Sequence, residues 1–383
     1  MRTTTVVSAL LPTVLSSVIQ ATEEISPALS FDKRQDLTAE SLGGKILQAD
    51  VYAGIAGLNQ QVYQATQQSS QWKTCNPSNI IVRREWSAFS TAEKKDYIKA
   101  VQCIAQLPPK FPKSVCPGCQ NRFDDFVATH IRQTFSIHNT GNFLPWHRYF
   151  TYAYEKTLRD ECGYKGYQPY YNWPRWSDDP TKSPLLDGSE TSLGGNGVLG
   201  CPVFTDLTCT PNNPISDYAD PTTAGQVGLG YNPRCLKRDI SAWTSSQWTN
   251  DEMVTKLLNS KDMKTFWYDM QGGENAFSNN FMGVHTAGHF TVGGDPGSDF
   301  LTSPGDPYFY AHHAQIDRVW WTWQNLNPSE RTKAIYGTTV LADPTAPNTT
   351  LADSMTLEYA FVGNITIGDA MSTMGGIFCY TYI

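Results

Sequence analysis

Long apolar runs, basic clusters and internal repeats are all missing from this chain of 383 residues. Acidic residues outnumber basic ones, 36 to 29, and no Lys- or Arg-rich run offers the basic face that a nucleic acid or an anionic membrane requires. The one apolar stretch near the N-terminus is too short to span a bilayer, and Pro12 interrupts it. We therefore expect a small-molecule substrate, with neither a nucleic acid nor a membrane as partner.

Histidine is also scarce, and its distribution is uneven. The chain has 7 histidines, and all of them lie in two stretches, 130–147 and 285–313. Histidines used as ordinary surface or core residues would be scattered along the chain. Imidazoles gathered in this way indicate a shared chemical task, of which metal ligation is the commonest.

The N-terminal residues predict a secreted protein. One early positive charge, a short apolar stretch and a small residue at Ala21 are typical of a signal peptide, here 1–21. The dibasic pair Lys33-Arg34 ends a predicted pro-segment, 22–34. We expect this segment to be removed during maturation.

The remaining residues, 35–383, are predicted to form a single catalytic domain, because no low-complexity linker divides them. Two sequons, at Asn348 and Asn364, suit a secretory route. The sequence does not indicate the oligomeric state.

The chain has 9 cysteines, all beyond the predicted signal peptide, where an oxidising compartment favours disulfides. Their odd number predicts that at least one thiol is free, modified or paired with another chain. Cys116 and Cys119 have the spacing of half a zinc knuckle, but no second pair follows at zinc-ribbon spacing. A structural disulfide is the favoured interpretation of this pair.

Four histidine-bearing segments are predicted to be helical. Apolar residues of the first recur at the spacing of one helical face, and His130 belongs to this inward stripe. Prolines at the starts of the second and fourth suit the first turn of a helix, and His285 and His289 project from one face of the third. The predicted helices are 122–134, 144–162, one around 285–289, and 306–326, with His138 on the loop after the first.

This pattern predicts a mainly α fold, with a central four-helix bundle around a metal site and few short strands. The stretch 174–248 is dense in Pro, Gly, Asn, Asp, Ser and Thr, and we expect it to form long irregular loops.

The donor set narrows the choice of metal. Glu-x-x-His pairs, which bundle di-iron sites use, are absent from both stretches. His285 and His289 lack the intervening glutamate of zinc metalloproteases, so a zinc hydrolase is a weaker alternative. Six neutral imidazoles, three from each stretch, suit two copper ions that bind O2 between them.

The two histidine motifs resemble those of a known superfamily. His130, His138 eight residues later and the run from Leu144 to Phe150 look like the first copper motif of tyrosinases, catechol oxidases and hemocyanins, the type-3 copper proteins. The runs 284–289 and 306–320 look like the second copper motif. The resemblance implies a four-helix bundle that holds a dicopper centre, in agreement with the predicted bundle.

The resemblance also implies which imidazoles bind copper. In the family the third ligand of the second site stands four residues before an aspartate, here Asp317, which selects His313 over its neighbour His312. Asp317 itself is expected either to orient an imidazole or to pair with Arg318 or another base. The implied metal ligands are His130, His138, His147, His285, His289 and His313.

One departure from the family pattern concerns a covalent bond. Many members have a cysteine two residues before the second histidine, joined to an imidazole as a thioether. Ser136 stands at this position here, so the thioether is absent.

The resemblance implies a reaction of phenols with O2. Members oxidise o-diphenols to o-quinones, some also hydroxylate monophenols efficiently, and hemocyanins only carry O2. Efficient hydroxylases often have asparagine after the first ligand of the second copper, where it holds a water together with a glutamate. Thr286 stands there in this chain, and Glu274 is the candidate glutamate.

The family places a residue that restricts access to the coppers thirteen residues before His313, where this chain has Phe300. Leu301 is the alternative if the register differs by one, and simple core packing of Phe300 is the structural alternative. These substitutions favour oxidation of o-diphenols, with o-aminophenols as further substrates. Efficient monophenol hydroxylation and O2 carriage remain alternatives.

The C-terminal residues resemble the end of the family's catalytic domain. A Tyr-x-Tyr motif stands there, formed by Tyr380 and Tyr382, and Arg83 or Arg84 resembles the arginine that packs near it. Latent members carry a further domain that plugs the site. The chain is expected to be a short, secreted, fungal-type form that lacks this lid.

Overall fold

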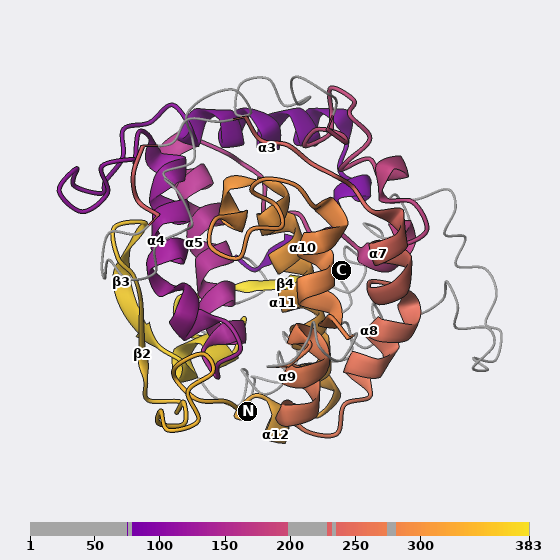
Figure 1. Ribbon diagram of the computed structural model, residues 1–383, viewed down its shortest axis with the longest axis vertical. Coiled ribbons are helices and arrows are strands. Elements are labelled where there is room, and N and C mark those ends of the chain that lie inside the picture. The colour runs from indigo at the N-terminus through magenta and orange to yellow at the C-terminus, as the bar shows by residue number, and fades with distance from the viewer. Residues whose placement is uncertain (1–74, 76–78, 198–227, 232–234, 274–280, 383) are drawn as a thin grey trace, which may run out of the picture.

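The computed structural model describes residue 75 and residues 79–197, 228–231, 235–273 and 281–382. Helices dominate these residues and the strands are short, which confirms the predicted mainly α fold (Figure 1). The predicted signal peptide and pro-segment lie outside the described residues, and so does Glu274. No helix among the described residues is long and apolar enough to cross a membrane.

Four helices form the centre of the molecule, and they are the four that the sequence predicts. α5 packs against both α4 and α11, and α10 packs against α11. The bounds are α4 (Arg122–Ile137), α5 (Phe143–Cys162), α10 (Gly283–Val292) and α11 (Tyr308–Leu326).

Local signals fix where these helices begin and end. At the start of α4, Asn121 and Asp124 cap each other's backbone N–H groups. α5 ends at Gly163, whose φ of 69° is the left-handed conformation that glycine adopts without strain. α11 begins just after Pro307, and the carboxylate of Asp306 accepts the N–H of Tyr308 over 2.8 Å.

Shorter helices surround this bundle. α7 and α9 pack against α10, and α3 packs against α5. Their bounds are α3 (Thr91–Ile104), α7 (Ala242–Trp248), α8 (Asp251–Leu258), α9 (Met263–Gln271) and α12 (Pro328–Arg331), with short 3-10 helices at Trp86–Ala88, Trp173–Trp176, Pro180–Lys182, Ser303–Gly305 and Gly368–Met371.

The prediction of irregular structure throughout 174–248 is wrong at its C-terminal end, where α7 forms. The Ser241 side chain caps α7 by accepting the N–H of Thr244. Packing against α10 then stabilises a segment whose polar composition alone indicated a loop.

Two small sheets complete the fold. β1 (Ile81–Arg83) pairs in parallel with β4 (Tyr380–Tyr382), with Ile81 opposite Tyr380, and so joins the two ends of the described chain. β2 (Ser354–Leu357) and β3 (Phe361–Thr366) form an antiparallel pair. The Cys75–Cys379 disulfide lies at the same junction as β1 and β4.

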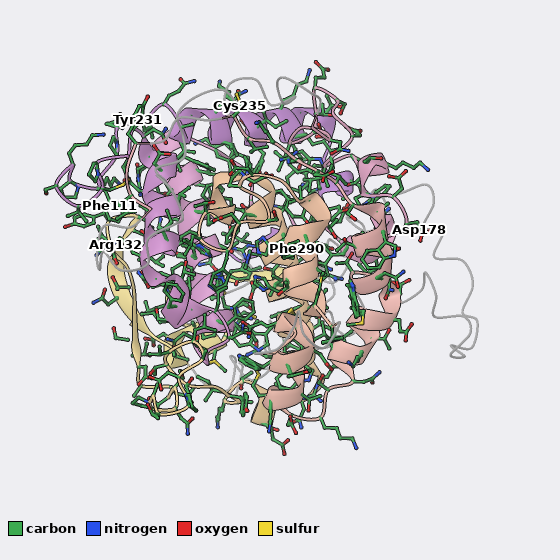
Figure 2. All side chains as sticks on the ribbon, in the orientation of Figure 1. Phe111, Arg132, Asp178, Tyr231, Cys235 and Phe290 are labelled. Atoms are coloured by element: carbon green, nitrogen blue, oxygen red, sulfur yellow. A yellow bond between two sulfur atoms is a disulfide. The ribbon has the colours of Figure 1, made fainter. Side chains whose placement is uncertain are left out.

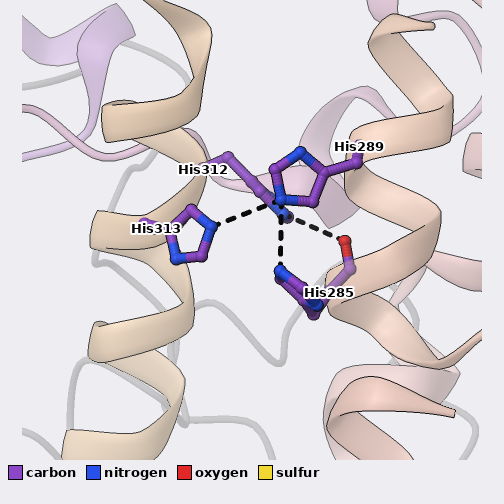
Figure 3. A group of neighbouring side chains, drawn as sticks. All are labelled: His285, His289, His312 and His313. Atoms are coloured by element: carbon purple, nitrogen blue, oxygen red, sulfur yellow. Dashed lines mark hydrogen bonds between the residues drawn. The ribbon is translucent and has the colours of Figure 1, made fainter. Parts of the chain in front are cut away.

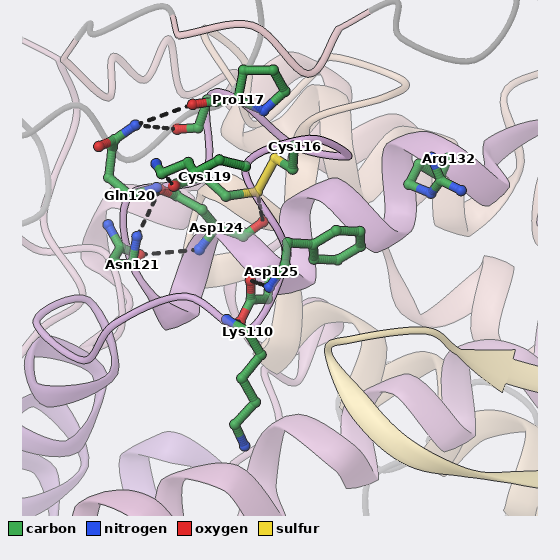
Figure 4. The surroundings of a disulfide bond; sticks show 12 residues. Lys110, Cys116, Pro117, Cys119, Gln120, Asn121, Asp124, Asp125 and Arg132 are labelled. Atoms are coloured by element: carbon green, nitrogen blue, oxygen red, sulfur yellow. Dashed lines mark hydrogen bonds between the residues drawn. A yellow bond between two sulfur atoms is a disulfide. The ribbon is translucent and has the colours of Figure 1, made fainter.

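Two further disulfides stabilise the bundle. Cys103–Cys162 joins α3 to the end of α5, and Cys116–Cys119 confirms the structural pairing expected for these residues. Figure 4 shows the Cys116–Cys119 loop beside the first turn of α4, where Asp124 accepts the N–H of Gln120 over 2.7 Å. Cys201 and Cys209 lie outside the described residues.

A buried ionic network connects β1, β4, α5 and α11. Asp317 accepts hydrogen bonds from Arg148 and from the hydroxyls of Tyr380 and Tyr382, over 2.5, 2.6 and 2.5 Å. Arg83, rather than Arg84, is the arginine that packs on this motif, with its guanidinium carbon 3.7 Å from the centroid of the Tyr380 ring.

Of the two expectations for Asp317, the ion pair is confirmed: its partner is another base, Arg148, and it does not orient an imidazole. The physical reason is that Arg148 projects from α5 into the same buried space as the carboxylate, whereas the guanidinium of Arg318 lies over the ring of Tyr170.

Aromatic and aliphatic side chains fill the space between the helices (Figure 2). Trp146, Tyr149 and Phe150 of α5 are buried, as are Trp320, Trp321 and Trp323 of α11. Burial of such large apolar areas is the dominant favourable term in folding, so the helices that carry the histidines form a rigid frame.

Candidate metal centre

The seven histidines form two groups inside the bundle. His130, His138 and His147 make up the first, and the second consists of His285, His289, His312 and His313. Within each group the ring nitrogens that could bind a metal lie within 4.8 Å of one another. The packing of α4, α5, α10 and α11 thus brings histidines from distant segments of the chain into one region.

The first group is held by backbone carbonyls. Nδ1 of His130 lies 2.8 Å from the carbonyl oxygen of Leu301, Nδ1 of His138 lies 3.0 Å from that of Thr134, and Nδ1 of His147 lies 2.8 Å from that of Phe143. Because a carbonyl can only accept, each Nδ1 carries the hydrogen and each Nε2 keeps its lone pair. The Nε2 atoms of His130 and His147 are buried and have no hydrogen-bond partner in the described structure.

In the second group three Nε2 atoms converge (Figure 3). Nε2 of His289 lies 3.1 Å from Nε2 of His285 and 3.3 Å from Nε2 of His313. Nδ1 of His289 lies 3.2 Å from the carbonyl oxygen of Gly297, so this ring also presents its lone pair toward the other two. Ring nitrogens this close need a hydrogen or a cation between them, because two lone pairs repel each other.

His312 has a different environment from the other six. The indole N–H of Trp173 donates to Nδ1 of His312 over 2.9 Å, so the ring hydrogen of the neutral imidazole lies on Nε2. Nε2 in turn donates to the carbonyl oxygen of His285 over 3.1 Å. Both nitrogens are thus used by the protein, and no lone pair of His312 is left for a metal.

The fit of His312 against α10 depends on a glycine. A Cβ atom added at Gly288 would lie 2.0 Å from Cε1 of His312, far closer than any real contact. Gly288 lies between His285 and His289 on α10, and its lack of a side chain lets the His312 ring reach the carbonyl of His285.

The two groups face each other. The rings of His147 and His313 stack with their centroids 4.4 Å apart, and those of His138 and His285 are 5.8 Å apart. Phe309 stacks on His313 at 4.0 Å and closes the site from the protein interior. Imidazoles of both groups therefore surround one shared space.

Burial keeps these imidazoles neutral. It lowers the pKa of His138 to about 3 and that of His289 to about 4, and it lowers the pKa values of the other five well below the usual range. Neighbouring imidazoles add to the effect at His130, His147, His285 and His313. A neutral imidazole is the form that binds a metal, so the sites are prepared for one without first losing protons.

The donor set agrees with copper. Each group offers three neutral imidazole nitrogens, a set that suits copper. Among the described residues no cluster of three or more carboxylates, which would suit a hard cation, occurs. Carbonyl partners on the Nδ1 side fix the rings of His130, His138, His147 and His289, as is usual for metal-binding histidines.

Phe300 lies at the edge of this centre. Its ring centroid is 4.7 Å from that of His138, and its side chain is 38% exposed, whereas the adjacent Leu301 is 9% exposed. Of the two alternatives for a residue that restricts access, Phe300 is the one that contacts a histidine of the site with its ring.

Thr286 lies next to His285, and its hydroxyl donates to the carbonyl of Gln271 over 3.1 Å. The Gln271 side chain accepts the N–H of Asn139, which follows His138, over 2.8 Å. Gln271 thus connects the residues that follow one histidine of each group. Its amide nitrogen is buried and has no hydrogen-bond partner in the described structure.

Comparison with known proteins identifies the family. Residues 120–326 match the common central domain of tyrosinase. The chain belongs to the tyrosinase family. The tyrosinase-like protein orsC of Emericella nidulans is 40% identical to it over 334 residues, which cover 75% of this chain and 88% of that protein.

Two further tyrosinase relatives extend this result. The N-acetyl-6-hydroxytryptophan oxidase ivoB of Emericella nidulans is 32% identical over 345 residues, 80% of this chain and 93% of that protein. The solved structure of a mutant polyphenol oxidase from Thermothelomyces thermophila superimposes with a TM-score of 0.78 at 36% identity, and covers 88% of this chain and 98% of that one. The chain is therefore a copper oxidase of the type-3 copper proteins, for which two copper ions are expected.

In this tyrosinase-family site the thioether is absent, as the sequence indicates. The hydroxyl of Ser136 donates to the carbonyl of Gln133 over 2.8 Å, and the first histidine group of the described structure includes no cysteine. His138 is instead oriented by the carbonyl of Thr134 alone.

Sequence reasoning misses Trp173, Gln271 and Asn139. Trp173 lies 139 residues from its partner His312, and no local pattern connects the two. Asn139 directly follows a candidate ligand in the sequence. Its φ of 48° is a left-handed conformation, which asparagine adopts more readily than most residues.

Proposed function

We propose that this tyrosinase-family oxidase uses O2 to oxidise o-diphenols, and also o-aminophenols, to quinone-type products. The observation that carries the proposal is the pair of three-imidazole groups whose Nε2 atoms face one another across the bundle. We assign His130, His138 and His147 to one copper, and His285, His289 and His313 to the other.

Copper held by both groups would supply a redox pair able to accept electrons from the substrate and pass them to O2. In the balanced reaction two o-diphenols and one O2 give two o-quinones and two waters. The protein's own contribution is orientation, because the carbonyls of Leu301, Phe143 and Gly297 fix the histidine rings by their Nδ1 hydrogens.

His312 takes no part as a ligand in this assignment. It acts as a positioning residue that ties α11 to the carbonyl of His285 and to Trp173. The choice of His313 rests on Nε2 of that ring, which lies 3.3 Å from Nε2 of His289 among the other imidazoles of the group.

Diphenols are the favoured substrates because Thr286 stands where efficient monophenol hydroxylases often have asparagine, and its hydroxyl hydrogen is donated to the carbonyl of Gln271. Glu274, which precedes His285 in the sequence, remains the candidate base. Phe300 is proposed to limit how substrates approach His138.

A second class of substrate has independent support. The relative ivoB is named for oxidation of a hydroxylated tryptophan, and it aligns with 80% of this chain. Hydroxylated heteroaromatic rings with a side substituent are therefore candidates beside simple catechols.

We further propose that the mature protein is secreted as a single catalytic domain from 35 to 383 after removal of 1–21 and 22–34. Asn348 and Asn364, the two sequon asparagines, are both exposed, so both are accessible to glycosylation.

The decisive experiment for this function is a turnover assay on protein loaded with Cu²⁺. Quinone absorbance should rise on addition of catechol, should require O2 and should vanish after chelation of the metal. Full copper content without quinone formation would contradict the oxidase and favour an O2 carrier. Faster turnover of tyrosine than of catechol would instead favour a monophenol hydroxylase.

A further inference from the structure

Phe135 is a large aromatic residue that the fold leaves exposed beside the metal centre. It lies in the last turn of α4, three residues before His138, and its side chain is 60% exposed. Its ring packs edge to face with that of Phe300, with centroids 6.3 Å apart. An exposed phenylalanine that contacts the edge of a site is a candidate for ligand binding rather than for folding.

The rings form a continuous line from the surface to the metal centre. Phe135 contacts Phe300, the Phe300 ring lies 4.7 Å from that of His138, and the His138 ring lies 5.8 Å from that of His285. A substrate whose hydroxyls lie between the two histidine groups would direct a substituent on the far side of its ring along this line.

The backbone on both sides of this line is fixed. Asp299 accepts the N–H groups of Leu301 and Thr302 over 2.9 and 2.7 Å, and His130 holds the carbonyl of Leu301. These contacts immobilise the residues that flank Phe300. A rigid binding surface loses little conformational entropy when a ligand binds.

The backbone at Phe135 is also held in place. The backbone N–H of Leu341 donates to the carbonyl of Phe135 over 2.8 Å, which joins the end of α4 to a neighbouring loop. Val340, the residue before Leu341, is 40% exposed.

We propose that Phe135 and Phe300 together form an apolar rim that binds the ring substituent of the substrate. The rim makes Phe135 a specificity-determining residue and selects phenols that carry a bulky apolar or aryl group opposite the reacting hydroxyls. This inference rests on the proposed function, and it adds the class of substrate that the site prefers.

Aromatic contacts of this kind contribute about 1 kcal/mol, which corresponds to about a fivefold change in affinity. The test compares 4-phenylcatechol with catechol in the wild type and in Phe135→Ala. The ratio of kcat/KM for 4-phenylcatechol to kcat/KM for catechol should fall about fivefold in the variant, mainly through KM.

Two control variants accompany this test. Phe135→Leu keeps an apolar side chain, so the ratio of the two kcat/KM values should fall less in this variant than in Phe135→Ala. Trp243→Ala removes another exposed aromatic residue, 66% exposed on α7, and should leave the ratio unchanged. If kcat/KM for both substrates fell by the same factor in Phe135→Ala, the effect would be structural and the proposed rim would be contradicted.

Calorimetric binding of 4-phenylcatechol provides a readout that does not depend on turnover. Binding should weaken about fivefold in Phe135→Ala. Equal binding by the wild type and the variant would overturn the rim even if catechol oxidation is confirmed. Absence of catechol oxidation by the wild type would contradict the proposed function alone, because the binding comparison would still decide the role of Phe135.

Discussion

The indole N–H of Trp173 donates a hydrogen bond to Nδ1 of His312, a residue 139 positions away, over 2.9 Å. This contact gives His312 a different role from His313, its neighbour in the sequence. His312 is used by Trp173 and by the carbonyl of His285, whereas Nε2 of His313 lies among the other imidazoles of its group. The protein thus contains six histidines available to a metal and one that supports them.

Replacement of Trp173 by Phe should weaken this support without removing a metal ligand. Loss of the indole N–H leaves a buried imidazole nitrogen without a donor, which costs about 1–3 kcal/mol. Urea unfolding should therefore show lower stability, while elemental analysis still finds two coppers. Trp243→Phe, at an exposed position, is the matched control and should change neither value. Loss of one copper in Trp173→Phe would mean that His312 is itself a ligand.

Acid should destabilise the metal-free protein. Burial lowers the pKa of His138 to about 3 and that of His289 to about 4, from 6.5 in the unfolded chain. Below 6.5 the unfolded state therefore binds more protons than the folded state, so stability present above this pH is lost as the pH falls toward the folded values. Each such imidazole costs ~1.4 kcal/mol per pH unit in that window.

Thermal unfolding of metal-free protein over this pH range measures the effect. Because the chain has no histidine outside the two groups, no other imidazole contributes to a decline just below pH 6.5. A melting temperature that does not fall between about pH 6.5 and pH 5 would contradict burial of neutral imidazoles.

Substitution of Asp317 by Asn should destabilise the fold strongly. The carboxylate is the main acceptor for buried Arg148 and lies 3.5 Å from Nη1 of Arg83. Removal of one partner from a buried ion pair leaves an uncompensated charge and costs about 3–5 kcal/mol. Urea unfolding gives this value directly.

The control for Asp317→Asn is Glu190→Gln, which breaks the exposed pair between Lys95 and Glu190. Exposed pairs are screened by water, so this variant should be as stable as the wild type. Equal stability of both variants would show that the network around Asp317 does not stabilise the junction of β1, β4, α5 and α11.

Replacement of Thr286 by Asn should alter the rate on monophenols relative to the rate on diphenols. Asparagine at this position adds an amide oxygen able to hold a water near the phenolic hydroxyl. The rate on tyrosine relative to that on catechol should rise about fivefold, the value of one hydrogen bond of ~1 kcal/mol. Thr286→Val, similar in shape but without a polar group, is the control and should not raise this ratio. An unchanged ratio in Thr286→Asn would show that the position does not control monophenol use.

Much of the metal centre could be predicted from the sequence because its determinants are local. The spacing of apolar residues predicts α4, the proline after Asp306 predicts the start of α11, and the separation of His285 from His289 places both on one helical face. The distinction between His312 and His313 is implied by the family resemblance, in which the third ligand stands four residues before an aspartate, here Asp317.

The remaining features depend on contacts between distant segments. The carbonyl of Leu301 holds His130 across 171 residues, and the Gln271 side chain reaches Asn139 across 132. Polar composition predicts a loop at α7, yet packing against α10 makes it helical. Such contacts are set by the packing of the whole domain, which local periodicity does not specify.

Copper content per chain in His313→Ala and His312→Ala tests the account most directly. His313→Ala should bind one copper and lose catechol oxidation, whereas His312→Ala should retain two coppers with reduced stability, because it leaves Trp173 and the carbonyl of His285 unpaired. The reverse result, one copper in His312→Ala and two in His313→Ala, would contradict the assignment of three imidazoles to each metal.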